Sequence, residues 1–427
     1  MEINIDPIQA TERSWTFMVY LAGDNNLEHF ALKDLAEMKR AGSTPQVAIV
    51  AQLDGLSDRS TRRYFLQQNT SLPQDCLATL PEVNTGDPIA LFNFIEWATQ
   101  TFPAEHYGLI LWNHGAGWKD DDIYQAAQKA GQSGKVIDKM ISRAGVRRSR
   151  RALFRPTLEK VVDGHLRAIL FDDTSADFLD NIELKQVLQK AVSILRRPLD
   201  LLGFDACLMS MLEVQYQVRT CSQVMVGSQE IEPGDGWPYE GILRKLVIDP
   251  GMSAAHLGSL IVNEYLESYR QNLPPAGVTQ SAVNCRLLDP LAASVSQLAN
   301  VLQNGLAHSE DWPTPVDDLI STVQRQALRF RDQDYFDLAD ICRQLSDLDP
   351  GGPASQAANG VLDVLNGVDS PVVKAGSQGD SKAGACGISV YLPARWLSPL
   401  YQTLDFAQEQ SWDNFLKTLI PPDKVNE

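Results

Sequence analysis

Several features that define other classes of protein are missing from this chain of 427 residues. It has no apolar run long enough to cross a membrane, so we expect no membrane partner. No basic and then apolar leader precedes the first long apolar segment, which predicts a cytoplasmic location. Internal repeats, a P-loop, a G-x-G-x-x-G motif and metal-ligand spacings are also missing, so nucleotide chemistry is not expected.

Cysteine and positive charge are both in short supply. The six cysteines are scattered with no C-x-x-C pair, which predicts reduced thiols rather than disulfides or a zinc site. With 37 basic and 54 acidic residues the formal net charge is −17. That balance argues against non-specific binding of nucleic acid and is compatible with basic substrates.

What the sequence does contain is an alternation of apolar and amphipathic segments. Apolar runs at 15–22, 47–53 and 107–112 alternate with helical patterns at 27–39 and 88–102. This order is typical of an α/β fold with a mostly parallel central sheet, whose strands are buried on both faces. Further segments continue the pattern, with strands expected at 62–66 (suited to a sheet edge), 166–171, 199–205 and 224–230, and helices at 181–195 and 254–273.

The last third of the chain is less regular and begins after the turn-forming residues 274–277. There we expect a strand at 281–285, a helix at 287–306, a helix starting near 334, a turn region at 372–380 and a strand at 387–393. The predicted organisation is an N-terminal tail (1–14), an α/β domain (15–275) with a basic loop at about 119–167, and a C-terminal α+β region (276–427).

Cys207 stands where an apolar strand ends and a helical pattern begins. A thiol near a helix N-terminus is stabilised as the thiolate, which is the nucleophilic form. The alternative is a buried and unreactive cysteine, which is the commoner role of a lone cysteine.

His114 closes another apolar strand and is followed by Gly115, which lets the backbone approach a ligand. Ligands of open α/β sheets bind at the carboxyl ends of the strands, so His114 and Cys207 can share one edge. A cysteine and a histidine on one edge suit nucleophilic thiol catalysis. The alternative is a histidine with an ordinary structural role in a loop.

Residues 129–160 invert the charge of the chain, since ten basic residues face only Asp138 and Glu159. A solvated loop, a nucleic-acid-binding tail and a segment cut by a basic-specific protease all fit this composition. The acidic remainder of the chain and the lack of stacking aromatics within the stretch argue against nucleic acid.

A second charged loop, 230–239, contains Glu230, Glu232 and Asp235 together with Trp237 and Tyr239. One interpretation is a structural turn with solvated carboxylates. The other is a wall of a pocket that holds a cation.

Several of these segments resemble motifs of the clostripain family of cysteine peptidases. The segments are 15–28, 112–115, 203–209 and 227–239, with weaker similarity at 337–340 and 387–393. The family belongs with caspases, gingipains and legumains, so the resemblance implies a caspase-like α/β/α sandwich. In caspases the histidine precedes the cysteine by about 50 residues. Here 93 residues separate them, and removing the basic loop restores a similar spacing.

The resemblance also implies roles for individual residues. Cys207 would be the nucleophile and His114 the general base and acid, with a thioester intermediate whose oxyanion is held by the backbone N–H groups of Gly115 and Cys207. Asp205 and Asp235 would bind an Arg or Lys side chain before the scissile bond. Family members are often activated by self-cleavage, and the matching window here contains Lys139, Arg143, Arg147, Arg148, Arg150, Arg151 and Arg155.

The predicted function is therefore a cysteine endopeptidase that cleaves polypeptides after Arg or Lys and processes itself in the basic loop. Its chemistry needs no cofactor; calcium is possible, but Asp120–Asp122 form no known calcium loop and metal stays unassigned. The rival hypothesis is a catalytically inactive caspase-like interaction module, against which the retention of the cysteine, the histidine and both pocket acids speaks.

Overall fold

The structure is a computed structural model of the chain. It describes residues 13–25, 27–113, 115, 117–118, 175, 179–308, 310, 312 and 314–420. The predicted basic loop and the strand predicted at 166–171 lie outside these residues.

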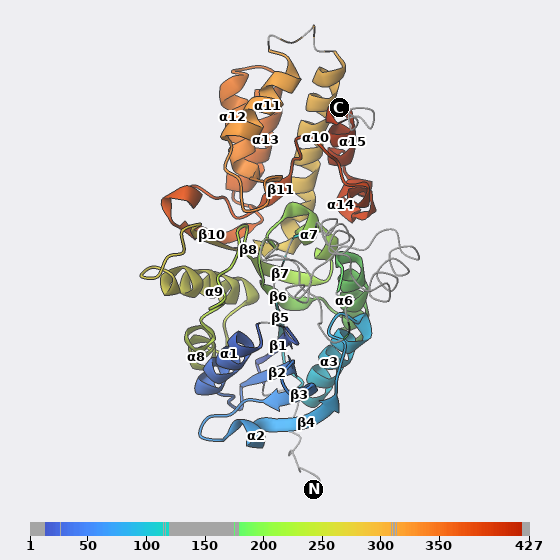
Figure 1. Cartoon of the computed structure of the whole chain (residues 1–427). Coiled ribbons are helices and arrows are strands. Elements are labelled where there is room, and N and C mark those ends of the chain that lie inside the picture. The colour runs from blue at the N-terminus through green and yellow to red at the C-terminus, as the bar shows by residue number, and fades with distance from the viewer. Residues whose placement is uncertain are drawn as a thin grey trace.

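Nine of the described strands form one sheet in the order β10-β8-β7-β6-β5-β1-β2-β3-β4 (Figure 1). The parallel centre consists of β1 (Trp15–Gly23), β2 (Val47–Gly55), β5 (His106–Trp112), β6 (Leu199–Asp205) and β7 (Ser222–Gly227). The strands β3 (Ser60–Phe65), β4 (Cys76–Pro81), β8 (Val278–Asn284) and β10 (Val372–Gln378) add to it antiparallel. Every residue of β1 and β2 is buried, as expected for strands covered on both faces.

Helices cover both faces of this sheet, and side chains of β1 alternate between them. Phe17 packs into the cluster that includes Leu35, while Met18 packs on the other side with Leu91. One face carries α1 (Glu28–Ala41), α8 (Tyr239–Ile248) and α9 (Ala254–Ser268); the other carries α3 (Pro88–Thr101), α6 (Asn181–Leu195) and α7 (Leu212–Val218). The predicted α/β/α sandwich with a mostly parallel sheet is confirmed.

Helix starts follow local capping chemistry. The Asp87 carboxylate accepts the Ile89 N–H at 2.9 Å before α3, and Asp180 with Glu183 forms a capping box before α6. No helix among the described residues is long and apolar enough to span a membrane.

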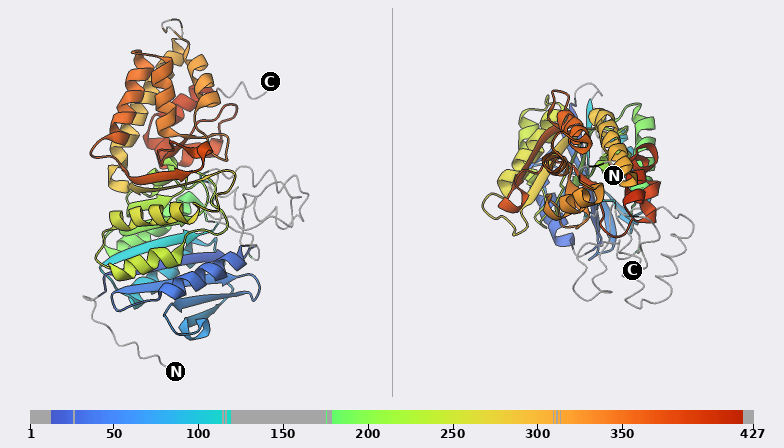
Figure 2. Two further views of the ribbon diagram at one scale, coloured as in Figure 1. Left: turned by 90° about the vertical axis from the view of Figure 1, so that its left-hand side faces the viewer. Right: turned by 90° about the horizontal axis from the view of Figure 1, so that it is seen from above.

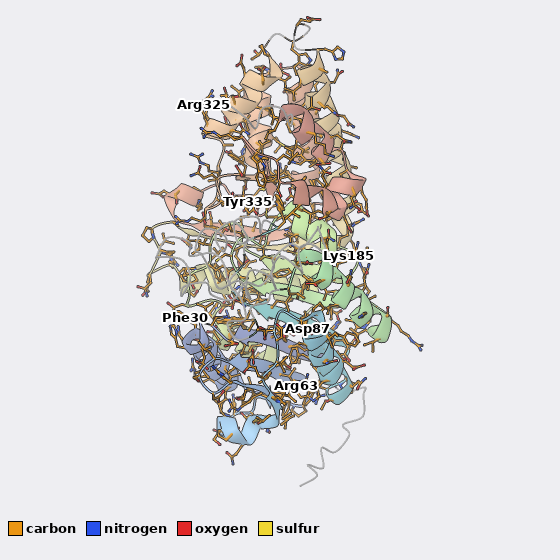
Figure 3. The ribbon with its side chains drawn as sticks, turned by 45° about the vertical axis from the view of Figure 1, so that its right-hand side comes forward. Phe30, Arg63, Asp87, Lys185, Arg325 and Tyr335 are labelled. Carbon is orange, nitrogen blue, oxygen red and sulfur yellow. The ribbon has the colours of Figure 1, made fainter. Side chains whose placement is uncertain are left out.

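The C-terminal helices lie beyond the β10 and β8 end of the sheet, opposite β4 (Figures 1 and 2). They are α10 (Leu288–Ala307), α11 (Val316–Gln326), α12 (Leu338–Leu348), α13 (Pro353–Asn366), α14 (Asp405–Glu409) and α15 (Trp412–Leu419), with a small sheet of β9 (Tyr335–Asp337) and β11 (Ser389–Tyr391). Short helical turns complete the described elements: α2 (Leu72–Asp75), η1 (Cys285–Leu287), η3 (Asp380–Lys382) and η4 (Pro399–Thr403). Lys185 of α6, labelled in Figure 3, pairs with Asp405 of α14 and ties this region to the sandwich.

Three expectations need correction. The strand near 62–66 is not at the edge of the sheet, because β4 pairs outside it. Residues 372–380, expected to form a turn, contain β10, an edge strand of half-exposed residues whose sequence gives little alternation. Since β8 and β10 both join the main sheet, the predicted domain boundary after residue 275 cuts through the sheet.

Candidate active site

The candidate nucleophile lies at the carboxyl edge of two adjacent parallel strands. Trp112 of β5 is in register with Asp205 of β6, and the Asn113 N–H donates to the Asp205 carbonyl at 3.3 Å. Gly115 packs directly on Cys207, since a Cβ atom there would lie 2.2 Å from the Cys207 carbonyl oxygen. His114, which stands between Asn113 and Gly115 in the sequence, lies outside the described residues.

Backbone N–H groups surround the Cys207 sulfur. The Glu232 N–H donates to Sγ at 3.2 Å, a Gly115 N–H also reaches it, and the thiol faces the Glu232 carbonyl at 3.7 Å. These amides favour the thiolate, but burial outweighs them and raises the pKa of the thiol. The sulfur is therefore protonated at neutral pH, and a nucleophilic attack needs a base to take that proton.

The predicted helix N-terminus does not stabilise the thiolate. The helix α7 begins at Leu212, and the chain between it and Cys207 makes a tight turn instead. Leu208 has a φ of 61°, in the left-handed region that is costly for a branched residue, roughly 1–3 kcal/mol. Hydrogen bonds hold the turn, as the Leu208 N–H donates to the Glu230 carbonyl at 3.1 Å and the Ser210 N–H to the Ser228 carbonyl at 2.8 Å.

A small cavity of about 60 Å³ opens beside the sulfur. Its lining residues are Leu27, Trp112, Asn113, Asp205, Ala206, Cys207, Glu232, Pro233, Gly234 and Gly236. Asp205 is only 5% exposed, and its carboxylate accepts the Tyr239 hydroxyl at 2.8 Å and the Trp237 N–H at 3.3 Å. Burial raises the pKa of Asp205 to about 6, against the lowering effect of its hydrogen bonds.

The acidic character of this cavity comes from more than one carboxyl group. Burial raises the pKa of Glu232 well above its ordinary value, and the charge of Asp205 and a hydrogen bond with it add to the rise. On the α1 side, burial and Asp205 raise the pKa of Asp34 to about 9, and Asp34 accepts the Trp112 indole N–H at 2.8 Å. Two carboxyl groups that hydrogen-bond to each other must share a proton, because carboxylates are acceptors only.

Asp235 lies apart from this group. Its side chain is 67% exposed and bonds to Lys33 of α1, with Oδ1 2.5 Å from Nζ. Only its flanking residues Gly234 and Gly236 line the cavity. Its role in binding a substrate cation stays a prediction.

The loop that carries these residues is pressed against α1. A Cβ atom at Gly234 would lie 2.7 Å from the Phe30 ring, so only glycine allows this approach. Phe30 is labelled in Figure 3, on α1. This contact fixes the wall of the cavity that faces Cys207.

One further group of acids could hold a metal ion. Among the described residues, Asp24, Asp54 and Glu82 each bring one carboxylate oxygen to within 4.8 Å of the others. Oxygen ligands of this kind suit calcium, but each of the three side chains also has other interactions within the protein. Asp120–Asp122, the acids weighed from the sequence, lie outside the described residues, as does the whole predicted cleavage window from Lys139 to Arg155.

Two acids in or beside the cavity, Glu232 in its lining and Asp34 behind it on α1, were not predicted from the sequence as site residues. Glu232 was only one of three acids in its loop, and nothing in the loop pattern separates it from the exposed Asp235. Asp34 lies on the same helical face as the buried Ala31, Leu35 and Met38. An acid within an apolar helical face is unusual, and this pattern could have predicted it from the sequence.

Comparison with known proteins places this chain and its fold among the cysteine peptidases. A sequence model described as the clostripain family matches residues 19–135 and 159–418. Clostripain of Hathewaya histolytica is 24% identical over an alignment of 478 positions, gaps included, which covers 95% of this chain and 80% of that protein.

Solved structures show the same fold. A secreted C11 cysteine protease from Bacteroides thetaiotaomicron, in complex with an irreversible peptide inhibitor, has a TM-score of 0.61 at 20% identity, covering 95% of this chain and 99% of that one. An inactive zymogen C11 protease from Parabacteroides distasonis has a TM-score of 0.63 at 18% identity, covering 94% and 99%. The fold is thus the caspase-like α/β/α sandwich of the C11 proteases.

The matched segments include both candidate catalytic positions and most of the chain. The chain belongs to the clostripain family of cysteine peptidases. It is accordingly a hydrolase with polypeptide substrates.

Proposed function

We propose that this peptidase cleaves polypeptides after arginine or lysine. The observation that carries the proposal is Asp205, a buried carboxyl group two positions before the nucleophile that lines the cavity beside Sγ. A guanidinium or ammonium group there would form charge-assisted hydrogen bonds, which are about twice as strong as neutral ones. An acidic or apolar side chain would bring no positive charge to these carboxyl groups.

The reaction follows from the placement of Cys207. His114 takes the thiol proton, and Sγ attacks the carbonyl carbon before the scissile bond to form a tetrahedral intermediate. The N–H groups of Gly115 and Cys207 would hold the oxyanion, a role that suits the close packing of these two residues. The proton then passes to the leaving amine, a thioester remains, and water hydrolyses it to release the acid and the free thiol.

Asp235 is proposed as a second acid near the substrate cation. Its flanking glycines line the cavity, so its own side chain would reach the cation after leaving Lys33. The exposed pair with Lys33 is weak, of the order of 0–1 kcal/mol, so this exchange costs little.

Self-processing in the 139–155 window is the last part of the proposal. The window lies between the histidine and the cysteine, and it contains seven basic residues after which a peptidase of the proposed specificity could cleave. The inactive zymogen described for the Parabacteroides distasonis protease supports an activation step in this family.

The test follows purified wild type and Cys207→Ala on a denaturing gel, alongside fluorogenic peptides that end in arginine, lysine, citrulline or aspartate. We expect wild type to split within 139–155 and to cleave the arginine and lysine peptides, while the variant stays whole and inactive. Cleavage of the citrulline peptide at the arginine rate contradicts the specificity. Two intact and inactive proteins, with and without calcium, instead favour the inactive interaction module.

A further inference from the structure

Glu232 lines the cavity beside Cys207, and among the described residues one amide donates a hydrogen bond to its carboxyl group. Its Oε1 atom accepts the Gln280 amide of β8 at 3.1 Å. Its Oε2 atom is buried, and no described residue donates a hydrogen bond to it. Asp205, which lines the same cavity, raises the pKa of Glu232 through its charge and a hydrogen bond.

No cation balances this pair within the described part of the chain. The titratable neighbours that raise the pKa of Glu232 are Asp205 and Cys207, both of which are acids. The basic groups of the neighbourhood are engaged elsewhere: Lys33 with Asp235 at 2.5 Å, and Lys382 with Glu230 at 2.6 Å. A proton shared between two carboxyl groups is then the remaining way to keep both buried.

We propose that Glu232 is a specificity-determining residue, and that it and Asp205 together bind the basic side chain of the substrate after giving up the proton they share. The inference rests on the proposed function, the preference for arginine or lysine, and adds Glu232 to its pocket. Asp205, Glu232 and Cys207 line the same cavity, so one cation can bind beside both acids while the scissile carbonyl meets the sulfur. The cation replaces the proton, and one proton is released to solvent for each substrate bound.

The backbone of Glu232 makes the arrangement specific to this residue. Its N–H donates to Sγ of Cys207 at 3.2 Å, while its side chain meets Asp205. The residue that recognises the cation is thus the one that hydrogen-bonds to the nucleophile. Replacing its carboxyl by an amide keeps the backbone contact and changes only the recognition of charge.

Other titratable groups lie near Asp205 and Glu232 and could also bind or release protons when a substrate binds. On α1 these neighbours are Asp34, Glu37 and Lys33. On α8, on α9 and directly after α9 they are Tyr239, Tyr265 and Tyr269, and in the loops they are Asp235 and Cys207. Burial raises the pKa of all three tyrosines, so they stay neutral near pH 6.5. Proton release near that pH therefore has to be compared between matched variants.

The test uses Glu232→Gln in the full chain, with Glu240→Gln as the matched control. Glu240 is a half-buried acid of α8 that pairs with Arg40 and Arg244 and does not line the cavity. Peptides that differ only in arginine or its neutral analogue citrulline measure the recognition of charge. We expect Glu232→Gln to lower kcat/KM for the arginine peptide about 10- to 100-fold while leaving the citrulline peptide within about threefold.

Two further measurements keep the outcome decisive. The rate of Cys207 alkylation by iodoacetamide should match wild type, because the backbone contact to the sulfur is kept. Glu232→Asp, which restores the charge, should recover part of the arginine preference. An unchanged ratio of arginine to citrulline cleavage in a folded Glu232→Gln protein overturns the inference, whereas no such preference in wild type overturns the proposed function.

The proton release is measured without turnover. Cys207→Ala is titrated with an acetylated peptide ending in arginine, by calorimetry at pH 6.5 in buffers of different ionisation enthalpy. We expect net proton release on binding, reduced when Glu232→Gln is added to the same background. Binding of the peptide with no proton release contradicts the shared proton.

Discussion

Two acids of the same loop, the buried Glu230 and the half-buried Glu232, have different partners in the protein. Glu230 forms an ion pair with Lys382 at 2.6 Å and accepts the N–H groups of Arg331 and Ile231 at 3.1 and 2.8 Å. Glu232 has one amide donor and an acidic neighbour. Glu230 therefore has a structural role. Glu232 forms no ion pair among the described residues, so a basic substrate can supply its cation.

The same contrast separates Glu213 from Asp205. Glu213 accepts the Tyr391 N–H and the Tyr401 hydroxyl, each at 3.0 Å, and so connects α7 with the C-terminal region. Burial raises the pKa of Glu213 to about 7, yet Glu213 does not line the cavity beside Cys207. A raised pKa alone does not identify a functional acid; an adjacent cavity and nucleophile do.

The largest effect should come from removing the charge of Asp205. We expect Asp205→Asn to lower kcat/KM for an arginine peptide about 100-fold or more, because a buried, hydrogen-bonded charge is lost from the cation site. The citrulline peptide should lose much less. Equal losses for both peptides would show that Asp205 supports the fold of the site rather than its specificity.

On the structural side of the comparison, Lys382→Met should destabilise the protein without altering specificity. It leaves the Glu230 carboxylate, which is 2% exposed, without its cation, at a cost of about 3–5 kcal/mol. The measurement is urea unfolding, together with the ratio of arginine to citrulline cleavage. The double variant Lys382→Met/Glu230→Gln should regain most of the stability, and a double variant as unstable as the single one would contradict the ion-pair explanation.

The sandwich was predictable because its central strands are buried on both faces. Runs such as 15–22 and 107–112 are apolar at nearly every position, and this pattern alone indicates a parallel strand. Edge strands gave no such signal: β4 and β10 are half exposed, and their polar residues resemble those of turns. The sheet therefore extends further than the apolar pattern shows.

The site was predictable in its sequence motifs but not in its charges. Cys207 and Gly115 come together because β5 and β6 are neighbours in the sheet. The strand pattern is compatible with this pairing, and the resemblance to the clostripain family predicts it. Which acid of the 230–239 loop faces inward depends on how the loop packs on α1 through Phe30 and Gly234. That packing involves residues about 200 positions apart, which no local pattern reports.

The smallest predicted effect concerns Asp34, a cavity-side acid with no place in the proposed chemistry. Its pKa in the folded protein is about 9, raised by burial and by Asp205, against an ordinary 3.8. Between those values the folded protein holds a proton that the unfolded chain has released, so the stability contributed by this group falls as pH rises. Asparagine has no proton to lose and still accepts the Trp112 indole N–H.

Asp34→Asn should therefore stabilise the protein by roughly 1–3 kcal/mol at pH 8, and the gain should shrink toward zero near pH 4. Thermal unfolding of both proteins across this range measures it, with Asp34→Ala as the control that also removes the acceptor of Trp112 and should gain less. A gain that does not depend on pH would mean that Asp34 is ionised in the folded state. The acidic cluster at the cavity would then need a cation from the protein itself, and the argument for a substrate cation at Asp205 and Glu232 would lose its basis.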